Sequence, residues 1–590
     1  MKYKLRGNFS NNLNTVLDEI LINRGVEEEK LNLFKNPNKE DCDNCAYWLD
    51  NIEDGVKQLL WHLENNKKIC FVVDADADGY TSSAILWLYV RKVYPQANLF
   101  FTVHKGKQHG LSDKVDYFLK ENYDLVICPD AASFDTEYQK ILNDGGINIL
   151  VIDHHIPPSN FIVEEIPKNT IVINNQLSEK YPNKTLCGAG MVYKFCQVLD
   201  DILQVNYADN FLDLVALGEI SDVMTKTEIE TNYLIEKGLK NIRNKGFQTL
   251  IESQSYSLKE KASFPYFNLN SIDIAFYISP LINAVTRVGS VAEREVMFYC
   301  FIEPNKEMAS TKRGAKTGDI ELAAEQTARI AKNVKSRQDK IKEKALELID
   351  FKIQKEGLLE NNILIIELED SDNIPSELTG LIAGACVSKY NKPCLILRRN
   401  DEGFLRGSGR NNEHFKELPD LKSFLEESGY FEYSMGHANA QGNSIHKSKL
   451  DSFIKYSNEY FTEEAFDNCY LVDFILSAEN NNIDLLLYEL SKHPEYFGNG
   501  INEIEVIIKN VSLKNYLIMG QYKNHIKFTQ NGVEYVRFYD EELINIVKNS
   551  DSPTMDVYGK ISLNEWGGKV TPQCNISDYE INSPLNKYDF

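Results

Sequence analysis

Short apolar runs alternate with longer helix-like segments between residues 67 and 173. The first run, residues 68–73, is an unbroken stretch rich in β-branched residues, which predicts a strand buried on both faces. Thr81 then occupies the position expected for a helix N-cap, and the residues up to Val93 have helical spacing. Further apolar runs follow at residues 99–103, 125–128, 149–152 and 170–173. This order predicts an α/β fold with a parallel sheet covered on both faces.

Polar side chains stand where each predicted strand ends. The first strand runs into Asp74, Asp76 and Asp78, followed by a glycine. The later runs are followed by His104-Lys105-Gly106-Lys107, by Pro129-Asp130 and by Asp153-His154-His155, and the apolar segment 214–220, interpreted as another buried strand, leads to Asp222. Ligands of parallel sheets bind beyond the C-terminal strand ends, so these residues are expected to converge on one site.

The residue types at this edge predict a metal site. Three carboxylates at alternate positions stay ionised close together only when a cation binds between them. An acidic surface turn or a helix cap would explain a single one of these groups but not four converging ones. A mixed set of Asp and His ligands favours Mn²⁺ or Mg²⁺ over Zn²⁺. Two such ions about 4 Å apart, sharing a carboxylate, can activate water against a phosphodiester.

The second half of the chain predicts further modules. Residues 308–350 favour a helix and are rich in Lys and Arg, so this helix either lines a nucleic-acid groove or is a solvated connection. A second α/β unit follows at residues 363–366, 381–387 and 394–397. Its Ser408 and Arg410 stand beside a glycine-rich turn, which suits a phosphate. From residue 465 onward, short alternating segments predict a small β-barrel.

Length and composition set the frame for these elements. A chain of 590 residues exceeds a single core and predicts three to four domains. The expected divisions are a helical leader at 1–60, a catalytic domain at 61–305, a connecting helix at 306–350, a substrate-binding domain at 351–464 and a barrel at 465–590. The net charge of −23 argues against indiscriminate nucleic-acid binding, although bound metal ions and local basic patches can offset it.

The expected cellular compartment is inferred from the absence of membrane-spanning and secretion signals and from the arrangement of the cysteines. No run of about eighteen apolar residues occurs, and the first residues do not have the apolar core of a signal peptide. The 11 cysteines are scattered, which suits a reducing compartment. We therefore expect a cytoplasmic protein with no membrane partner, with a monomer favoured.

The succession of these motifs resembles the DHH phosphoesterase superfamily. Asp-x-Asp-x-Asp-Gly after a strand, a strand-end Asp, Asp-His-His, and an Asp closing an apolar run match its four motifs. Three further stretches resemble the RecJ-type single-strand exonuclease branch: residues 186–190, residues 279–287, and the pair 407–410 and 436–442. Asn564–Gly568 with Thr571-Pro572-Gln573 is similar to the oligonucleotide-binding (OB) barrel of RecJ relatives.

The resemblance implies a role for each site residue. Asp130 bridges two metal ions, Asp76 holds the first ion with Asp74 beside it, and the second ion belongs to Asp78, His154 and Asp222. Asp153 orients the neighbouring histidine, and His155 faces the scissile phosphate. The implied substrate-binding residues are Arg287, Ser408, Arg410, His437, Lys105 and Lys107.

The chain departs from the family pattern at two places. After Asp130 it has Ala131-Ala132 where these enzymes usually have a polar residue and a glycine, so the local backbone geometry is open. Around residues 104–111 the family tends to carry an arginine and a Tyr-Gly pair, whereas this chain has His104, two lysines and His109-Gly110. That loop is either a phosphate contact or a solvated basic loop.

Three functions are compatible with the sequence. The leading hypothesis is a Mn²⁺- or Mg²⁺-dependent, two-metal hydrolase that degrades single-stranded DNA from the 5′ end in repair or recombination. The second keeps the chemistry but acts on short oligoribonucleotides or cyclic dinucleotides, which the extra barrel disfavours. The third is a non-catalytic scaffold that binds replication or repair proteins, which the complete set of carboxylates and the His154-His155 pair disfavour.

Overall fold

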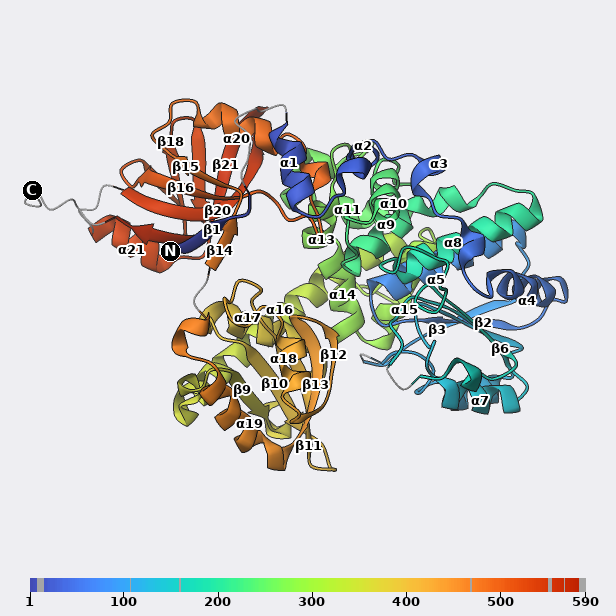
Figure 1. Ribbon diagram of the computed structural model, residues 1–590. Helices are drawn as coiled ribbons and strands as arrows, with labels where there is room; N and C mark the ends of the chain where they lie inside the picture. Colours follow the sequence, from blue (N-terminus) through green and yellow to red (C-terminus); the bar gives the residue numbers. More distant parts are fainter. Residues whose placement is uncertain are drawn as a thin grey trace, which may run out of the picture. The chain divides into compact units, whose positions relative to one another are not determined.

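A computed structural model describes residues 1–7, 15–106, 108–158, 161–466, 469–520, 522–549, 554–566 and 568–582 (Figure 1). The chain forms two compact units. One unit contains Met1–Asn23, Asp339–Pro494 and Glu503–Phe590, and the other contains Arg24–Gln338 and Glu495–Asn502. Among the described residues, no helix is both long enough and apolar enough to cross a lipid bilayer.

The centre of the Arg24–Gln338 unit is a five-stranded, fully parallel sheet. Its strands are β2 (Ile69–Val73), β3 (Leu99–Val103), β4 (Leu125–Pro129), β5 (Asn148–Asp153) and β6 (Thr170–Asn174), in the order β3-β2-β4-β5-β6. Alternate side chains of each central strand point to opposite faces, so that Phe71 packs in one hydrophobic cluster and Val72 in another. The predicted parallel α/β sheet is confirmed.

Helices cover both faces of this sheet. The cluster around Phe71 includes α4 (Ile52–Glu64), α5 (Ala77–Val93) and α8 (Gly188–Leu203), and the cluster around Val72 includes α6 (Val115–Glu121) and α7 (Thr136–Asp144). The other helices of the Arg24–Gln338 unit are α2 (Leu31–Lys35), α3 (Lys39–Cys42), α9 (Leu212–Ser221), α10 (Ile229–Leu239), α11 (Lys245–Glu252), α12 (Ser255–Leu258), α13 (Ser271–Tyr277), α14 (Ser279–Val288) and α15 (Val291–Ile302). Helix α1 (Val16–Asn23) belongs to the other compact unit.

Two sequence-based expectations about this unit were wrong. The N-cap of α5 is Asp76, whose carboxylate accepts the N–H of Gly79, whereas Thr81 lies inside the helix and donates to Ala77 and Asp78 carbonyls. The helix thus begins within the acidic motif itself. The segment before Asp222 is not a strand but helix α9, which is buried almost along its whole length. An all-round apolar helix gives the same unbroken hydrophobic run as a buried strand.

The connection from residue 306 to residue 356 is a hairpin followed by a long helix. Strands β7 (Glu307–Ala309) and β8 (Ile320–Leu322) pair antiparallel, and α16 runs from Ala323 to Glu356. The expected helix over 308–350 was therefore wrong in its first part. Gly314 and Gly318 take φ angles of 85° and 98°, which glycine adopts without steric cost and which allow the hairpin loop to turn.

A second sheet follows α16, with order β12-β13-β11-β10-β9. It consists of β9 (Leu364–Leu368), β10 (Cys394–Arg399), β11 (Phe404–Arg410), β12 (Phe431–His437) and β13 (Ala440–His446), with α17 (Thr379–Tyr390), α18 (Leu421–Glu427) and α19 (Lys447–Tyr460). The glycine-rich turn expected beside Ser408 and Arg410 is strand β11, paired with both β10 and β13. The small glycines suit a close strand contact there, since a Cβ on Gly407 would lie 2.0 Å from the Ile396 carbonyl.

The C-terminal part is a seven-stranded mixed sheet, as the predicted barrel strands implied. Its order is β15-β16-β20-β21-β19-β18-β17. The strands are β15 (Phe474–Ser477), β16 (Glu505–Ser512), β17 (Tyr516–Met519), β18 (His525–Gln530), β19 (Val533–Arg537), β20 (Thr554–Trp566) and β21 (Lys569–Ile581), with α20 (Ile483–Ser491) and α21 (Glu541–Asn549).

The first residues of the chain belong to this C-terminal part. Strand β1 (Lys2–Leu5) pairs in parallel with β14 (Cys469–Val472), which Figure 1 shows as a blue strand beside orange ones. This strand was not anticipated in the leader expected to be mostly helical. The next residue, Arg6, lies 2.7 Å from the Glu505 carboxylate and 3.5 Å from that of Asp473, both of which are buried.

We expect Arg6→Met to destabilise the compact unit that contains Arg6 by about 3 kcal/mol, because it removes a guanidinium that lies beside two buried carboxylates. Urea denaturation followed by fluorescence measures the change. Lys4→Met removes a cation from an exposed site on the same strand and should change the unfolding free energy by less than about 0.5 kcal/mol. Equal stability of the two variants would contradict this role for Arg6.

Candidate metal centre

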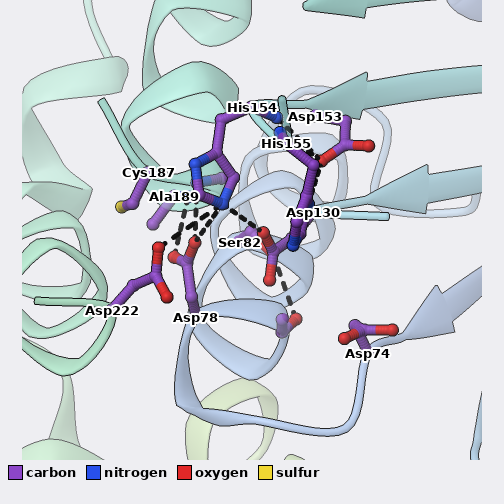
Figure 2. A network of polar contacts seen from close by, with 12 residues as sticks. Asp74, Asp78, Ser82, Asp130, Asp153, His154, His155, Cys187, Ala189 and Asp222 are labelled. Carbon is purple, nitrogen blue, oxygen red and sulfur yellow. Dashed lines mark hydrogen bonds and ion pairs between the residues drawn. The ribbon is translucent and has the colours of Figure 1, made fainter. Parts of the chain in front are cut away.

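One imidazole is surrounded by three carboxylates at the C-terminal edge of the parallel sheet. The Nε2 atom of His154 lies 3.1 Å from Asp130 Oδ1, 3.4 Å from Asp222 Oδ2 and 3.9 Å from Asp78 Oδ2. Figure 2 shows the three carboxylates converging on this ring, with Asp130 between Asp222 and Asp74 in the view. These side chains come from the ends of β4, β5 and α9 and from the first turn of α5.

The N-terminus of α8 holds Asp78 in place. Asp78 Oδ2 accepts the N–H of Gly188 at 2.6 Å, and Asp78 Oδ1 accepts the N–H of Ala189 at 2.9 Å. A helix N-terminus stabilises a carboxylate both through free N–H groups and through its dipole. Gly218 of α9 makes room for the carboxylate, because a Cβ there would lie 2.6 Å from Asp78 Oδ1.

The backbone of Asp130 is in the left-handed region, and this conformation directs its side chain into the site. Asp130 has φ 70°, and its N–H donates to the Ile152 carbonyl at 2.7 Å. Gly188 faces it closely, since a Cβ on that glycine would lie 2.5 Å from Asp130 Cβ. Ala132 also has a positive φ, 76°, which costs an L-residue about 1 kcal/mol. The site therefore stores backbone strain where the family resemblance leads one to expect glycine.

Burial and repulsion make this cluster electrostatically unfavourable without a cation. Burial, together with the negative charges of Asp78, Asp76 and Asp74, raises the pKa of Asp130 well above its usual range. Burial and the charges of Asp78 and Asp76 likewise raise the pKa of Asp222. Oδ1 of Asp130 is buried and, within the described part of the chain, accepts no hydrogen bond. Carboxylate oxygens that converge, one of them buried without a hydrogen-bond donor in the described ranges, are what a hard divalent cation binds, so these residues fit a metal site.

A second group of possible ligands lies around Asp74. Ligand atoms of Asp74, Asp76 and His109 all lie within 4.8 Å of one another. The buried Asp74 directly follows β2, and a Cβ on Gly79 would lie 2.5 Å from its Cβ. Arg287, on α14, interacts electrostatically with Asp76, while burial lowers the pKa of its guanidinium. The three aspartates of the acidic motif thus belong to two neighbouring groups. Asp78 lies near His154, and Asp74 and Asp76 lie near His109.

Asp153 and His155 form a pair beside the cluster. Asp153 Oδ1 lies 2.7 Å from His155 Nδ1 and accepts the backbone N–H groups of His154 and His155, and its Oδ2 accepts that of Ser133. Burial alone would raise the pKa of Asp153, but the adjacent His155 lowers it below its usual range. Burial would lower the pKa of His155, but Asp153 raises it to about 10.

The structure does not gather every residue expected for substrate binding. Lys105 is exposed beyond β3, and Lys107 lies outside the described residues. Ser408 and Arg410 lie on β11, where Ser408 Oγ is 2.9 Å from Thr379 Oγ1 and Arg410 donates to the Gly409 carbonyl. Arg410 and His437 both pair with Ala440, so the register places them at the same end of that sheet.

Sequence reasoning missed three contributions to the site. The N–H groups of Gly188 and Ala189 hold Asp78, and the imidazoles of His104 and His109 both approach Asp74. The small-residue sequence at the start of α8 was a usable signal for the first. The histidines were included in a loop interpreted as basic, and nothing in their spacing shows which way an irregular loop directs them.

Comparison with family models identifies two parts of the chain. Residues 68–219 match the N-terminal domain of the DHH family, and residues 472–578 match the RecJ OB domain. A protein of the SPbeta prophage of Bacillus subtilis strain 168, YorK, provisionally named a single-strand DNA-specific exonuclease, is 35% identical over 98% of this chain and 98% of its own length. The RecJ single-stranded-DNA-specific exonuclease of the same strain is 23% identical over 95% of this chain and 67% of its length.

Solved structures agree with this comparison at the level of the fold. The crystal structure of Thermus thermophilus RecJ in complex with Mn²⁺ superposes with a TM-score of 0.68 at 19% identity, covering 99% of this chain and 80% of that one. The sheet and its acidic edge define a DHH-type domain. With the extended match to YorK and the RecJ OB domain, the chain belongs to the RecJ-type family of the DHH superfamily.

We expect Asp130→Asn to stabilise the metal-free protein. The raised pKa of Asp130 means that its ionisation costs folding free energy at every pH above its unfolded pKa of about 4. Asn also tolerates φ 70°. In EDTA at pH 8 the unfolding free energy should rise by about 2 kcal/mol, and the gain should shrink as the pH falls towards 4.

Urea denaturation at several pH values tests this expectation. Asp124→Asn is the control, for which we expect a change of opposite sign. Burial would raise the pKa of Asp124, but the Lys68 N–H and the Lys67 ammonium lower it. The ionised Asp124 carboxylate therefore stabilises the folded protein above pH ~4. That variant should lose stability at pH 8. A loss of stability in Asp130→Asn as well would show that the cluster is not under repulsion.

We expect Ala132→Gly to stabilise the protein by up to about 1 kcal/mol, because glycine adopts φ 76° without strain. The greater flexibility of glycine in the unfolded chain offsets part of this gain. Ala131→Gly is the control, because the neighbouring Ala131 does not have a positive φ. This variant should lower the unfolding free energy of the protein. Urea unfolding in EDTA measures both, and an unchanged or lower stability for Ala132→Gly would contradict backbone strain at this position.

Proposed function

We propose that this protein is a metal-dependent exonuclease that hydrolyses single-stranded DNA from the 5′ end, using two Mn²⁺ or Mg²⁺ ions. The observation that carries the proposal is the approach of His154 to Asp78, Asp130 and Asp222 at the edge of a DHH-type sheet. The relatives YorK and RecJ are named single-strand DNA-specific exonucleases, and RecJ crystal structures hold Mn²⁺ or Mg²⁺.

The carboxylates divide between two ions. Asp74 and Asp76 would hold the first ion, Asp78, His154 and Asp222 would hold the second, and Asp130 would contribute to both. This division is supported by two groups of possible ligands, Asp74-Asp76-His109 and Asp78-His154-Asp222, and by the place of Asp130 between Asp222 and Asp74 in Figure 2. A further group among the described residues combines Asp130 with Asp153, His154 and His155. When bound, two such ions activate a water molecule and neutralise the charge that develops on the phosphodiester.

The two adjacent histidines have different tasks. His154 turns its Nε2 towards the carboxylates, while Asp153 accepts a hydrogen bond from His155 Nδ1. With a pKa of about 10, His155 is protonated at neutral pH, so its Nε2–H remains available beside the site. His155 donates this proton to a phosphate oxygen of the substrate or to the leaving group, and Asp153 positions it.

The substrate is a strand rather than a small nucleotide. The match of residues 472–578 to the RecJ OB domain supports this choice, because OB folds bind single strands through grooves and stacking aromatics. Arg287 near Asp76 contacts the phosphate next to the scissile bond. Ser408, Arg410 and His437 contact phosphates further along the strand, and the activity serves DNA repair or recombination together with replication or repair proteins.

Release of nucleotides from labelled single-stranded DNA in Mn²⁺ tests the proposal. Asp153→Ala and His154→Ala should each lower the rate by about 10²-fold or more, because each removes a group that positions or holds the reacting centre. Asp144→Ala is a matched control, since Asp144 is exposed in the last turn of α7 and its loss should leave the rate unchanged. Circular dichroism shows whether all three variants remain folded.

Label position and substrate type separate the alternatives. Early release of a 5′ label, with a 3′ label retained in long fragments, is the expected result. Faster hydrolysis of dinucleotides or short oligoribonucleotides than of long DNA would favour the small-substrate alternative instead. Equal rates in the intact protein and in both site variants would overturn the assignment of this centre.

A further inference from the structure

The loop after β3 directs two imidazoles towards Asp74. His109 Nδ1 lies 2.5 Å from Asp74 Oδ2, and His104 Nε2 lies 3.8 Å from Asp74 Oδ1. These residues lie in the loop that the sequence leaves open as either a phosphate contact or a solvated basic loop. The structure therefore raises a different use for it, as part of the acidic site itself.

His104 is oriented by a carboxylate on its other side. Its side chain is fully buried, and its Nδ1 lies 2.8 Å from Asp113 Oδ1, which accepts the Nδ1–H. In the neutral ring Nε2 then carries the unshared electron pair. This atom is buried and, among the described residues, has no hydrogen-bond partner. A cation between this electron pair and the Asp74 oxygen, 3.8 Å away, would satisfy both buried atoms.

The loop backbone holds His109 in position. Gly110 has φ 69°, and a Cβ there would lie 2.2 Å from Asp135 Oδ2, so glycine is required for the close approach. The same oxygen of Asp135 accepts the N–H of Leu111 at 2.8 Å. This contact anchors the loop next to His109, whose imidazole is about half exposed and can adjust by a small rotation.

The distances fit the ligands of one ion. Two donors that bind the same cation at about 2.1 Å lie about 3.0 to 4.2 Å apart, depending on the angle between them. The 3.8 Å between His104 Nε2 and Asp74 Oδ1 falls in this range. Atoms of Asp74, Asp76 and His109 lie within 4.8 Å of one another. His109 Nδ1 and Asp74 Oδ2, 2.5 Å apart, are closer than two ligands of one ion, so ion binding would replace this hydrogen bond and move the two atoms apart by about 0.5 Å or more.

We propose that His104 and His109 are imidazole ligands of the first metal ion, together with Asp74 and Asp76. This inference rests on the proposed two-metal function and adds a ligand set to its first site. Nitrogen ligands bind Mn²⁺ more strongly than Mg²⁺, which prefers an all-oxygen environment. The first site of this chain is therefore selective for a transition metal, and the second site depends on His154 alone for its nitrogen.

Pulsed electron paramagnetic resonance of bound Mn²⁺ tests the proposal, because it detects ¹⁴N of a coordinated imidazole directly. The measurement is made in the His154→Gln protein, which lacks the imidazole of the second site. With Mn²⁺ bound, the ¹⁴N coupling should persist in this background. It should weaken when His109→Gln is added and vanish when His104→Gln is added as well.

Calorimetric titration supplies an independent readout. His109→Gln alone should lower Mn²⁺ affinity at one of the two sites by about 10- to 100-fold, with a change in Mg²⁺ affinity of less than about 3-fold. His446→Gln, in the other compact unit, is the matched control and should change neither affinity. Because His109 is partly exposed, its variant keeps the metal-free melting temperature, which checks for folding.

The outcomes distinguish this inference from the proposed function. Bound Mn²⁺ without ¹⁴N coupling in the His154→Gln protein overturns the imidazole ligands, while Mn²⁺-dependent nuclease activity of the intact protein still supports the function. Failure of the intact protein to bind Mn²⁺ overturns both. Equal losses of Mn²⁺ and Mg²⁺ affinity in His109→Gln would also contradict the proposal, because a merely structural histidine would affect the two ions alike.

Discussion

Mutual repulsion between buried carboxylates is the constraint around which the DHH-type domain is built. Asp78, Asp130 and Asp222 approach the same imidazole, and burial raises the pKa of each. The negative charges of neighbouring aspartates raise the pKa of Asp130 and Asp222 further. A protein selected for stability alone would not place these groups together. The surrounding structure therefore has to hold them in position at a cost in folding free energy.

The backbone provides that support through short-range devices. The α8 N-terminus donates two N–H groups to Asp78, Asp130 is directed inward by a left-handed φ, and Asp76 caps the helix that begins within its own motif. Gly79, Gly188 and Gly218 each stand where a Cβ would collide with one of the site aspartates. These devices link neighbouring elements, so the site is coupled to the packing of α5, α8 and α9 against the sheet.

The sequence predicted those parts of the fold whose signal is local. Continuous apolar runs predicted β2 to β6, and the polar residues after them predicted most of the residues that meet in the candidate metal centre, because strand direction alone determines which edge they reach. Helix α9 was misread since a fully buried helix has no amphipathic period. The pairing of β1 with β14 joins residues more than 460 positions apart, and no local pattern encodes such a partner. The direction of His104 and His109 depends on an irregular loop and was equally inaccessible.

The adjacent histidines show how one dipeptide can serve two opposite electrostatic needs. Successive residues beyond a strand end point in different directions, so His154 faces the carboxylates while His155 turns to Asp153. Asp153 stays ionised despite burial because the His155 imidazole lowers its pKa, and it also accepts backbone N–H groups from Ser133, His154 and His155. The charge of Asp153 raises the pKa of His155 to about 10, whereas His154 Nε2 lies among the carboxylates of Asp130, Asp222 and Asp78. The motif thus depends on one buried aspartate that binds the His155 ring and, through the backbone N–H of His154, the residue whose ring faces the other way.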